Sequence, residues 1–139
     1  MLTIGKLSRM AEVSRDTLRY YEREGLIEPA DKSPAGYRLY DKDSSRRVRF
    51  IKQAQHCGFT LAEIRELLVL RARDAACCGD VRKRAIEKKR QLEGKIRSMR
   101  AISKALDLLI ANCVDETRPV GECAILAAFE RPETTAATN

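Results

Sequence analysis

Apolar residues recur at helical spacing in two short stretches near the start of the chain, on either side of a tight polar connection. Ser14 is a favourable N-cap for the second stretch, Asp16 places a carboxylate in its first turn, and Gly25 ends it. Two short helices joined in this way form a helix-turn-helix pattern. The apolar residues at helical spacing in the first stretch are Ile4, Leu7 and Met10, and those predicted on the inner face of the second are Leu18 and Tyr21.

A turn, a strand and two further helices are predicted next. Pro34 and Gly36 mark the turn, and the residues after them alternate as in a small β-wing. A helix then runs to Gly58, and Thr60 opens another helix with Glu63 three residues on, which is a capping box. The residues predicted on the inner face of the first of these helices are Val48, Ile51 and Ala54.

One long helix without proline is predicted from about Gly79 to Asn112, and its apolar residues form a narrow seam. Seven-residue spacing on a charged helix is typical of a coiled coil. Such a helix spans roughly 50 Å, and one chain has too little other apolar mass to cover it. We therefore expect a second chain on the seam, rather than a helix that lies on its own domain. The two rows are Ala85, Leu92, Met99, Leu106 and Cys113, and Val81, Lys88, Lys95, Ile102 and Leu109.

Composition narrows the classes of function. Charged residues make up 34% of the chain and aromatic residues 5%, which suits long solvent-exposed helices. The net charge of +7 favours nucleic acid as a partner. The first residues do not resemble a signal peptide, and no apolar run approaches the ~20 residues of a membrane span. We therefore expect a cytoplasmic protein with reduced cysteines and no membrane partner. Because the sequence contains no recognisable set of catalytic residues, we do not expect an enzyme.

Basic residues cluster directly after the helix-turn-helix. Residues 32–52 hold seven Lys and Arg against two Asp, which suits phosphate contacts from a wing and the helix that follows it. The second helix would then enter the major groove of double-stranded DNA, with Tyr21 in the core rather than on the DNA. The candidate DNA-binding residues are Arg15, Thr17, Arg19, Tyr20, Lys32, Gly36, Tyr37, Arg38 and Arg46.

Four of the five cysteines are candidate ligands for a soft metal ion. Cys113 and Cys123 bracket an acidic loop, and Cys77 and Cys78 precede the long helix. Cys78 and Cys113 are 35 residues apart on one helix, so they cannot share a metal within one chain. Two antiparallel copies would place Cys78 of one beside Cys113 of the other. Helix N-termini at Cys78 and Cys123 favour the metal-binding thiolate.

Other interpretations of these residues stay open. Cys113 and Cys123 form a disulfide in one alternative, although a reducing compartment disfavours it. Cys77 is either a ligand or a bystander. We expect Cys57 to be a small packed residue, and His56, the single histidine, to be exposed or interfacial.

Three segments in this order resemble the MerR family of transcription regulators: IGKLSRMAEVSRDTLRYYEREGLI, GYRLYD and RRVRFIKQAQHCGFTLAEIRELL. The resemblance covers roughly residues 1–130. It implies a winged helix-turn-helix and a homodimer joined by an antiparallel coiled coil. It also implies that effector binding makes the dimer distort promoter DNA, so that RNA polymerase can use the promoter.

The resemblance also indicates which cysteines bind metal. Metal-sensing members carry one cysteine at the start of the dimerisation helix and two around a C-terminal loop, which fall on Cys78, Cys113 and Cys123. Cysteine rather than serine at the first position implies a divalent ion, either zinc, cadmium or lead, with mercury ranked below them. About one ion per site and two sites per dimer are expected. Val114 and the lack of a loop histidine argue against a two-zinc site. The candidates for a further ligand are Cys77, Asp115, Glu116 and Glu122.

We therefore predict a metal-responsive activator of a metal-resistance or efflux promoter. The alternatives are a thiol-based redox or electrophile sensor on the same scaffold and, in another class, a metal buffer or delivery protein. The predicted fold is mainly α. It comprises a DNA-binding domain over 1–73, a linker and dimerisation helix over 74–112, a metal-binding loop and short helix over 113–130, and a flexible tail over 131–139.

Overall fold

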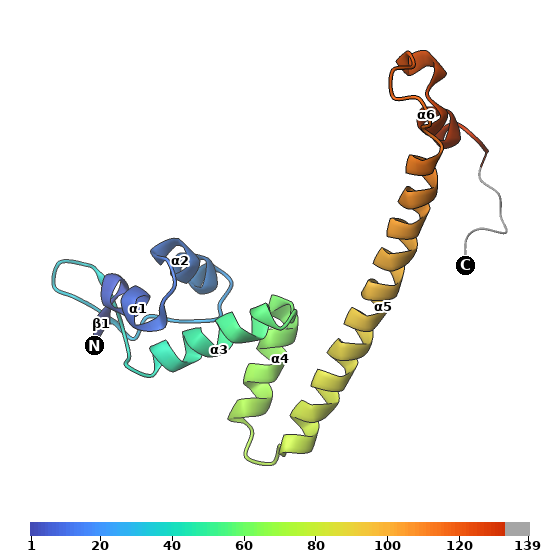
Figure 1. Ribbon diagram of the computed structural model, residues 1–139. Helices are drawn as coiled ribbons and strands as arrows, with labels where there is room; N and C mark the ends of the chain where they lie inside the picture. Colours follow the sequence, from blue (N-terminus) through green and yellow to red (C-terminus); the bar gives the residue numbers. More distant parts are fainter. Residues whose placement is uncertain (133–139) are drawn as a thin grey trace. The chain divides into compact units, whose positions relative to one another are not determined.

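The computed structural model describes residues 1–132, and these are mainly helical, as the sequence predicts. They fall into two compact units, Met1–Lys88 and a second unit from Lys89 onward. The division lies inside one long helix, α5 (Cys78–Ala111), so the first turns of that helix belong to the N-terminal unit (Figure 1). The domain boundaries drawn from the sequence stay predictions, and the predicted tail lies outside the described residues from Glu133 on.

The predicted helix-turn-helix is α1 (Ile4–Ala11) followed by α2 (Arg15–Arg23). The Ser14 side chain accepts a hydrogen bond from the backbone of the third residue that follows it, which confirms the predicted N-cap. Leu18 and Tyr21 are buried, so Tyr21 is a core residue as predicted. On α1 the buried residues are Leu7 and Ala11, and Met10 is 46% exposed.

The wing is an antiparallel pair, β2 (Asp31–Lys32) and β3 (Arg38–Tyr40), joined by a turn in which Gly36 has a φ of 87°. Only glycine adopts this left-handed conformation without strain. A third strand, β1 (Leu2–Thr3), pairs with the other edge of β3 and directly precedes α1. Because β1 ties the helix-turn-helix to the wing, α1, α2 and the wing are placed relative to one another.

Two further helices, α3 (Ser44–His56) and α4 (Leu61–Ala72), complete the N-terminal unit. Gly58 turns the chain between them with a φ of 92°, and Thr60 and Glu63 form the predicted capping box. One hydrophobic core joins these helices to α1, α2 and the wing. Its most deeply buried side chains are Leu7, Leu18, Leu26, Ile27, Tyr40, Val48, Ile51 and Ile64.

Cys57 is exposed, so the prediction of a small packed residue is wrong. The regular helix α3 ends at His56, and Cys57 caps it with a φ of −82° and a ψ of 3°. The chain then turns at Gly58, so Cys57 does not continue the inner face of α3. His56 is exposed, which agrees with one of its two predicted environments.

The second unit consists of the remainder of α5, a 3₁₀ turn η1 (Val120–Glu122) and α6 (Ala124–Phe129). Apolar residues of the predicted seam are largely exposed in the single chain, and Met99 is 69% exposed. No helix within residues 1–132 combines the length and apolarity needed to cross a bilayer.

Candidate nucleic-acid interface and metal centre

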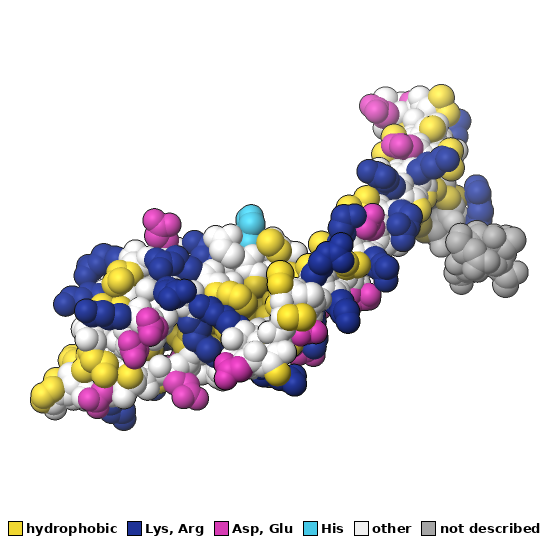
Figure 2. Space-filling model, turned by 90° about the horizontal axis from the view of Figure 1, so that it is seen from below, with side chains coloured by type: hydrophobic (Ala, Val, Ile, Leu, Met, Phe, Trp, Pro, Cys, Tyr) yellow, Lys and Arg dark blue, Asp and Glu magenta, His cyan; other side chains and the backbone are white. Residues whose placement is uncertain are grey.

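A groove of about 640 Å³ lies between α1, α2 and the wing. The charged side chains that line it are all guanidinium groups, contributed by α1, α2 and β3: Arg9, Arg15, Arg19 and Arg38. Figure 2 shows the wider setting, with Lys and Arg side chains crowded over the N-terminal unit. Guanidinium groups grouped in this way suit contacts with the phosphates of a nucleic acid.

Gly5 gives Arg15 room at this groove. A Cβ atom on Gly5 would lie 2.7 Å from the Nη2 atom of Arg15, which is closer than real Cβ atoms approach their neighbours. The absence of a side chain at Gly5 therefore lets the Arg15 guanidinium lie against α1.

The wing is held to α2 by Glu22. The Tyr40 hydroxyl donates a hydrogen bond to Glu22 Oε1 at 3.0 Å, and Arg38 forms an ion pair with Glu22 Oε2. Burial, followed by the hydrogen bond to Glu22, raises the pKa of Tyr40 to about 12. Tyr40 is thus a neutral hydrogen-bond donor at physiological pH, and Glu22 fixes β3 beside α2.

The structure brings together five of the predicted DNA-binding residues in this groove: Arg15, Arg19, Gly36, Tyr37 and Arg38. The other four do not line it: Thr17, Tyr20, Lys32 and Arg46. The Thr17 hydroxyl hydrogen-bonds with the Ser14 cap at 2.8 Å, which engages it within α2. Arg9 lines the groove and was missed by the sequence analysis, although its position on the polar face of α1 was a usable signal.

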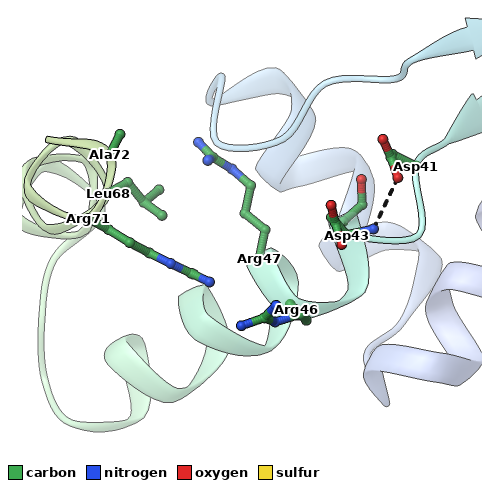
Figure 3. Close-up of a pocket in the computed structure, with 8 residues that line it drawn as sticks. Asp41, Asp43, Arg46, Arg47, Leu68, Arg71 and Ala72 are labelled. Atoms are coloured by element: carbon green, nitrogen blue, oxygen red, sulfur yellow. Dashed lines mark hydrogen bonds between the residues drawn. The ribbon is translucent and has the colours of Figure 1, made fainter. Parts of the chain in front are cut away.

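Arg46 lies instead in a separate cavity of about 410 Å³ between the start of α3 and the end of α4 (Figure 3). Acidic and basic side chains mix there, because Asp41 and Asp43 share the lining with Arg46, Arg47 and Arg71. Arg47 Nε donates to the Leu26 carbonyl oxygen at 2.6 Å, and the Arg71 guanidinium lies over the Phe50 ring at 5.2 Å. These two arginines therefore have roles in holding the fold.

In the second unit, Cys113 and Cys123 line one cavity of about 200 Å³. Cys113 follows the end of α5, and Cys123 is the residue directly before α6, as predicted. Asp115, Glu116 and Glu122 line the same cavity, so two thiols and three carboxyl groups share it. This donor set fits a soft or borderline divalent ion.

Asp115 is partly committed to the loop itself. Its Oδ1 atom accepts hydrogen bonds from the Thr117 hydroxyl at 2.6 Å and from the Thr117 backbone N–H at 3.0 Å. These bonds lower the pKa of Asp115. The carboxylate thus stabilises the turn after Cys113.

Cys78 is the first residue of α5, which confirms its predicted position at a helix N-terminus, and both Cys77 and Cys78 are exposed. The backbone N–H of Cys77 donates to Asp80 Oδ2 at 2.9 Å, which lowers the pKa of Asp80 and closes the first turn of the helix. Within residues 1–132 of a single chain, no three His, Cys, Asp or Glu side chains are grouped so as to hold a metal ion.

The sequence and the fold match known proteins over most of their length. The model of the MerR HTH family regulatory protein matches residues 2–69, and that of the MerR DNA-binding segment matches residues 45–109. The chain is 33% identical over 132 residues to the HTH-type transcriptional regulator ZntR of Escherichia coli K12, with 94% of each chain covered. The chain belongs to the MerR family of helix-turn-helix regulatory proteins.

Two further MerR-family relatives are named for metals. The mercuric resistance operon regulatory protein of Bacillus cereus is 38% identical over 123 residues, which cover 88% of this chain and 92% of that protein. The crystal structure of the transcription regulator PbrR691 from Ralstonia metallidurans CH34, in complex with lead(II), superposes with a TM-score of 0.82 and 37% identity, covering 93% of this chain and 99% of that one. The MerR-family chain described here is a DNA-binding transcription regulator with the predicted winged helix-turn-helix.

Proposed function

We propose that this chain activates a metal-resistance or efflux promoter by distorting operator DNA when a divalent soft metal ion binds its thiolates. The observation that carries the metal assignment is the cavity shared by Cys113 and Cys123. The similarity to relatives named for mercury resistance and solved with lead(II) supports it. Zinc, cadmium and lead rank together above mercury.

The site is completed by Cys78 of a second copy. Cys78 is the first residue of α5 and Cys113 lies just past its end. A helix of 34 residues spans roughly 50 Å, so one ion cannot bind both thiolates of one chain. An antiparallel homodimer, with the exposed apolar seam of α5 at its centre, brings Cys78 of one copy beside Cys113 and Cys123 of the other. Each dimer then has two equivalent sites, each with about one ion.

The identity of a fourth ligand depends on the metal. Three thiolates suffice for lead or mercury, whereas zinc and cadmium favour four ligands in a tetrahedron. Cys77 adjoins Cys78, and Glu116 and Glu122 line the loop cavity. Because Thr117 already engages Asp115, that carboxylate is the weaker oxygen candidate.

The basic groove supplies the DNA contacts. Helix α2 enters the major groove with Arg15 and Arg19 on the phosphates at its edge, and Tyr37 and Arg38 of the wing contact the DNA backbone. The dimer acts on promoter DNA together with RNA polymerase in the cytoplasm, and it has no catalytic activity of its own.

The test is to replace Cys78, Cys113 and Cys123 with Ser one at a time, with Cys57→Ser as the matched control. Operator footprints should persist in every variant, while induction by zinc, cadmium and lead fails in the three site variants and survives in C57S. Metal induction that survives all three site changes would refute the metal assignment. Induction of the wild type by peroxide in chelated cells would favour a redox sensor, and loss of any specific footprint would favour a metal buffer.

A further inference from the structure

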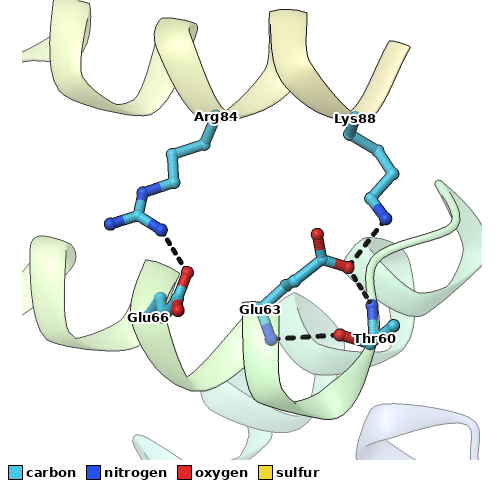
Figure 4. Close-up of polar contacts among 5 residues, drawn as sticks. All are labelled: Thr60, Glu63, Glu66, Arg84 and Lys88. Carbon is cyan, nitrogen blue, oxygen red and sulfur yellow. Dashed lines mark hydrogen bonds and ion pairs between the residues drawn. The ribbon is translucent and has the colours of Figure 1, made fainter. Parts of the chain in front are cut away.

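Lys88 is a charged residue buried in the N-terminal unit, with only 6% of its surface exposed. Its Nζ atom lies 2.7 Å from Glu63 Oε1 and 5.8 Å from the centre of the Phe59 ring (Figure 4 shows the ion pair). The sequence places this lysine in an apolar row of the long helix. The structure explains its presence there, because side-chain ion pairs join the first turns of α5 to α4 and Lys88 meets the Glu63 carboxylate.

A second ion pair joins the same two helices one turn earlier. Arg84 lies four residues before Lys88 on α5 and binds Glu66 on α4 (Figure 4). Both side chains of this pair are about half exposed, at 43% and 53%, whereas the Lys88 side chain is 8% exposed and that of Glu63 is 30% exposed. Exposed pairs contribute little, and removing one partner of a buried pair leaves an uncompensated charge. Breaking the Glu63–Lys88 pair should therefore cost more than breaking the Glu66–Arg84 pair.

Glu63 also belongs to the first turn of α4. Its Oε1 atom accepts the Thr60 backbone N–H at 2.9 Å, and its own N–H donates to the Thr60 hydroxyl at 3.2 Å. Phe59, under the Lys88 ammonium, packs against the core of the unit. A movement of Lys88 would thus directly affect the capping box of α4, through Glu63, and the core, through Phe59.

We propose that the Glu63–Lys88 pair is the coupling element that transmits metal binding at Cys78 to the DNA-binding unit. Cys78 and Lys88 are ten residues apart on one continuous helix, so a displacement of the thiolate is carried to the lysine. The Glu63–Lys88 ion pair then moves α4 together with α5. Without this ion pair, α5 shifts against α4, and metal binding no longer changes the arrangement of the DNA-binding helices in the N-terminal unit. This inference rests on the proposed function.

Two variants isolate the ion pair. In Glu63→Gln the side chain keeps an oxygen that accepts the Thr60 N–H, so the capping box persists while the charge is lost. In Lys88→Met an unbranched side chain still covers Phe59, but the ammonium group is lost. Arg84→Met, in the exposed pair one turn earlier, and Lys89→Met, in the exposed pair with Glu93, are the matched controls.

The readout is the coupling between two binding events. Lead(II) affinity is measured by thiolate charge-transfer absorption, with and without operator DNA, and operator affinity is measured with and without lead(II). The coupling ratio compares lead(II) affinity with operator DNA to lead(II) affinity without it. We expect this ratio to fall by about 5-fold or more in E63Q and K88M. The ratio of operator affinities with and without lead(II) should fall by the same factor. Lead(II) stoichiometry and metal-free operator affinity should stay within about 2-fold of wild type. Both controls should retain the wild-type ratio.

A wild-type ratio in E63Q or in K88M, in protein shown by circular dichroism to be folded, would overturn the inference while leaving the proposed function intact. Because K88M affects only the more exposed Glu63 carboxylate, it decides the question even where E63Q, which removes the carboxylate beside the buried Lys88 ammonium, does not fold. If lead(II) binding and operator binding do not affect one another in the wild-type protein, that result would instead overturn the proposed function, and the inference with it.

Discussion

The Tyr40 hydroxyl donates a hydrogen bond to the Glu22 carboxylate at 3.0 Å, and this contact fastens the wing to the second helix of the helix-turn-helix. Tyr40 is fully buried, and the Glu22 side chain is only 14% exposed. The same carboxylate binds Arg38, so one acidic residue organises a wing of basic and aromatic side chains.

Replacing Tyr40 with Phe should lower the free energy of unfolding by about 1–2 kcal/mol, because a charged acceptor loses a buried donor. Urea denaturation of the purified protein measures this change. Tyr37→Phe is the control, since Tyr37 is 71% exposed and should change stability by less than about 0.5 kcal/mol. Equal free energies of unfolding for Y40F and wild type would show that the Tyr40–Glu22 hydrogen bond does not stabilise the fold.

Arg15→Ala should weaken operator binding and reduce the slope of log K against log salt concentration by about 1, because one phosphate contact is lost. Fluorescence anisotropy at several salt concentrations gives the slope. Lys89→Ala removes a charge outside the groove and should leave the slope unchanged. An unchanged slope in R15A would exclude Arg15 from phosphate binding.

Gly5→Ala tests the groove without removing a charge. The added Cβ would lie 2.7 Å from the Arg15 guanidinium, whose flexible end must move away. Operator affinity should fall about as far as in R15A, while the free energy of unfolding stays within about 0.5 kcal/mol of wild type. Wild-type operator affinity in G5A would show that Arg15 does not have to lie against α1 in order to bind DNA.

The parts of the fold that sequence reasoning predicted are those set by local chemistry. The Ser14 cap, the Thr60–Glu63 capping box and the turn at Gly36 each depend on a few neighbouring residues, and the structure contains all three. Strand β1 was missed, because two residues carry no periodic signal and pair with β3 nearly forty residues later.

For the candidate site, too, the sequence predicted the features set by local pattern and missed those set by tertiary packing. The placement of Cys78 and Cys123 at helix starts follows from local pattern, and the structure agrees with it. The contribution of Arg9 to the groove and the pairing of Lys88 with Glu63 arise from tertiary packing between helices, which the periodicity of one helix does not reveal. Cys57 was misplaced because the helix was predicted to run to Gly58, whereas α3 ends at His56.

Stability at acid pH should depend on Glu63. The Lys88 ammonium and the Thr60 backbone N–H lower the pKa of Glu63 from 4.5 to about 2. Since the folded-state pKa lies below the unfolded one, the ionised carboxylate stabilises the fold above about pH 4.5, and this contribution is lost as the pH falls toward 2. The difference in urea midpoint between wild type and E63Q should therefore shrink between neutral pH and about pH 3. A constant difference would mean that the Glu63 charge does not contribute to stability.

The shared metal site is tested most directly by a heterodimer of two defective chains, one carrying Cys78→Ser and the other Cys113→Ser with Cys123→Ser. If each site combines Cys78 of one copy with the two loop cysteines of the other, this heterodimer retains one complete site and loses the other entirely. Lead(II) titration of the purified heterodimer should then give about half of the wild-type charge-transfer absorption, at wild-type affinity, while neither parent homodimer binds in this way. Heterodimers with no more binding than their parents would contradict a site built across the dimer.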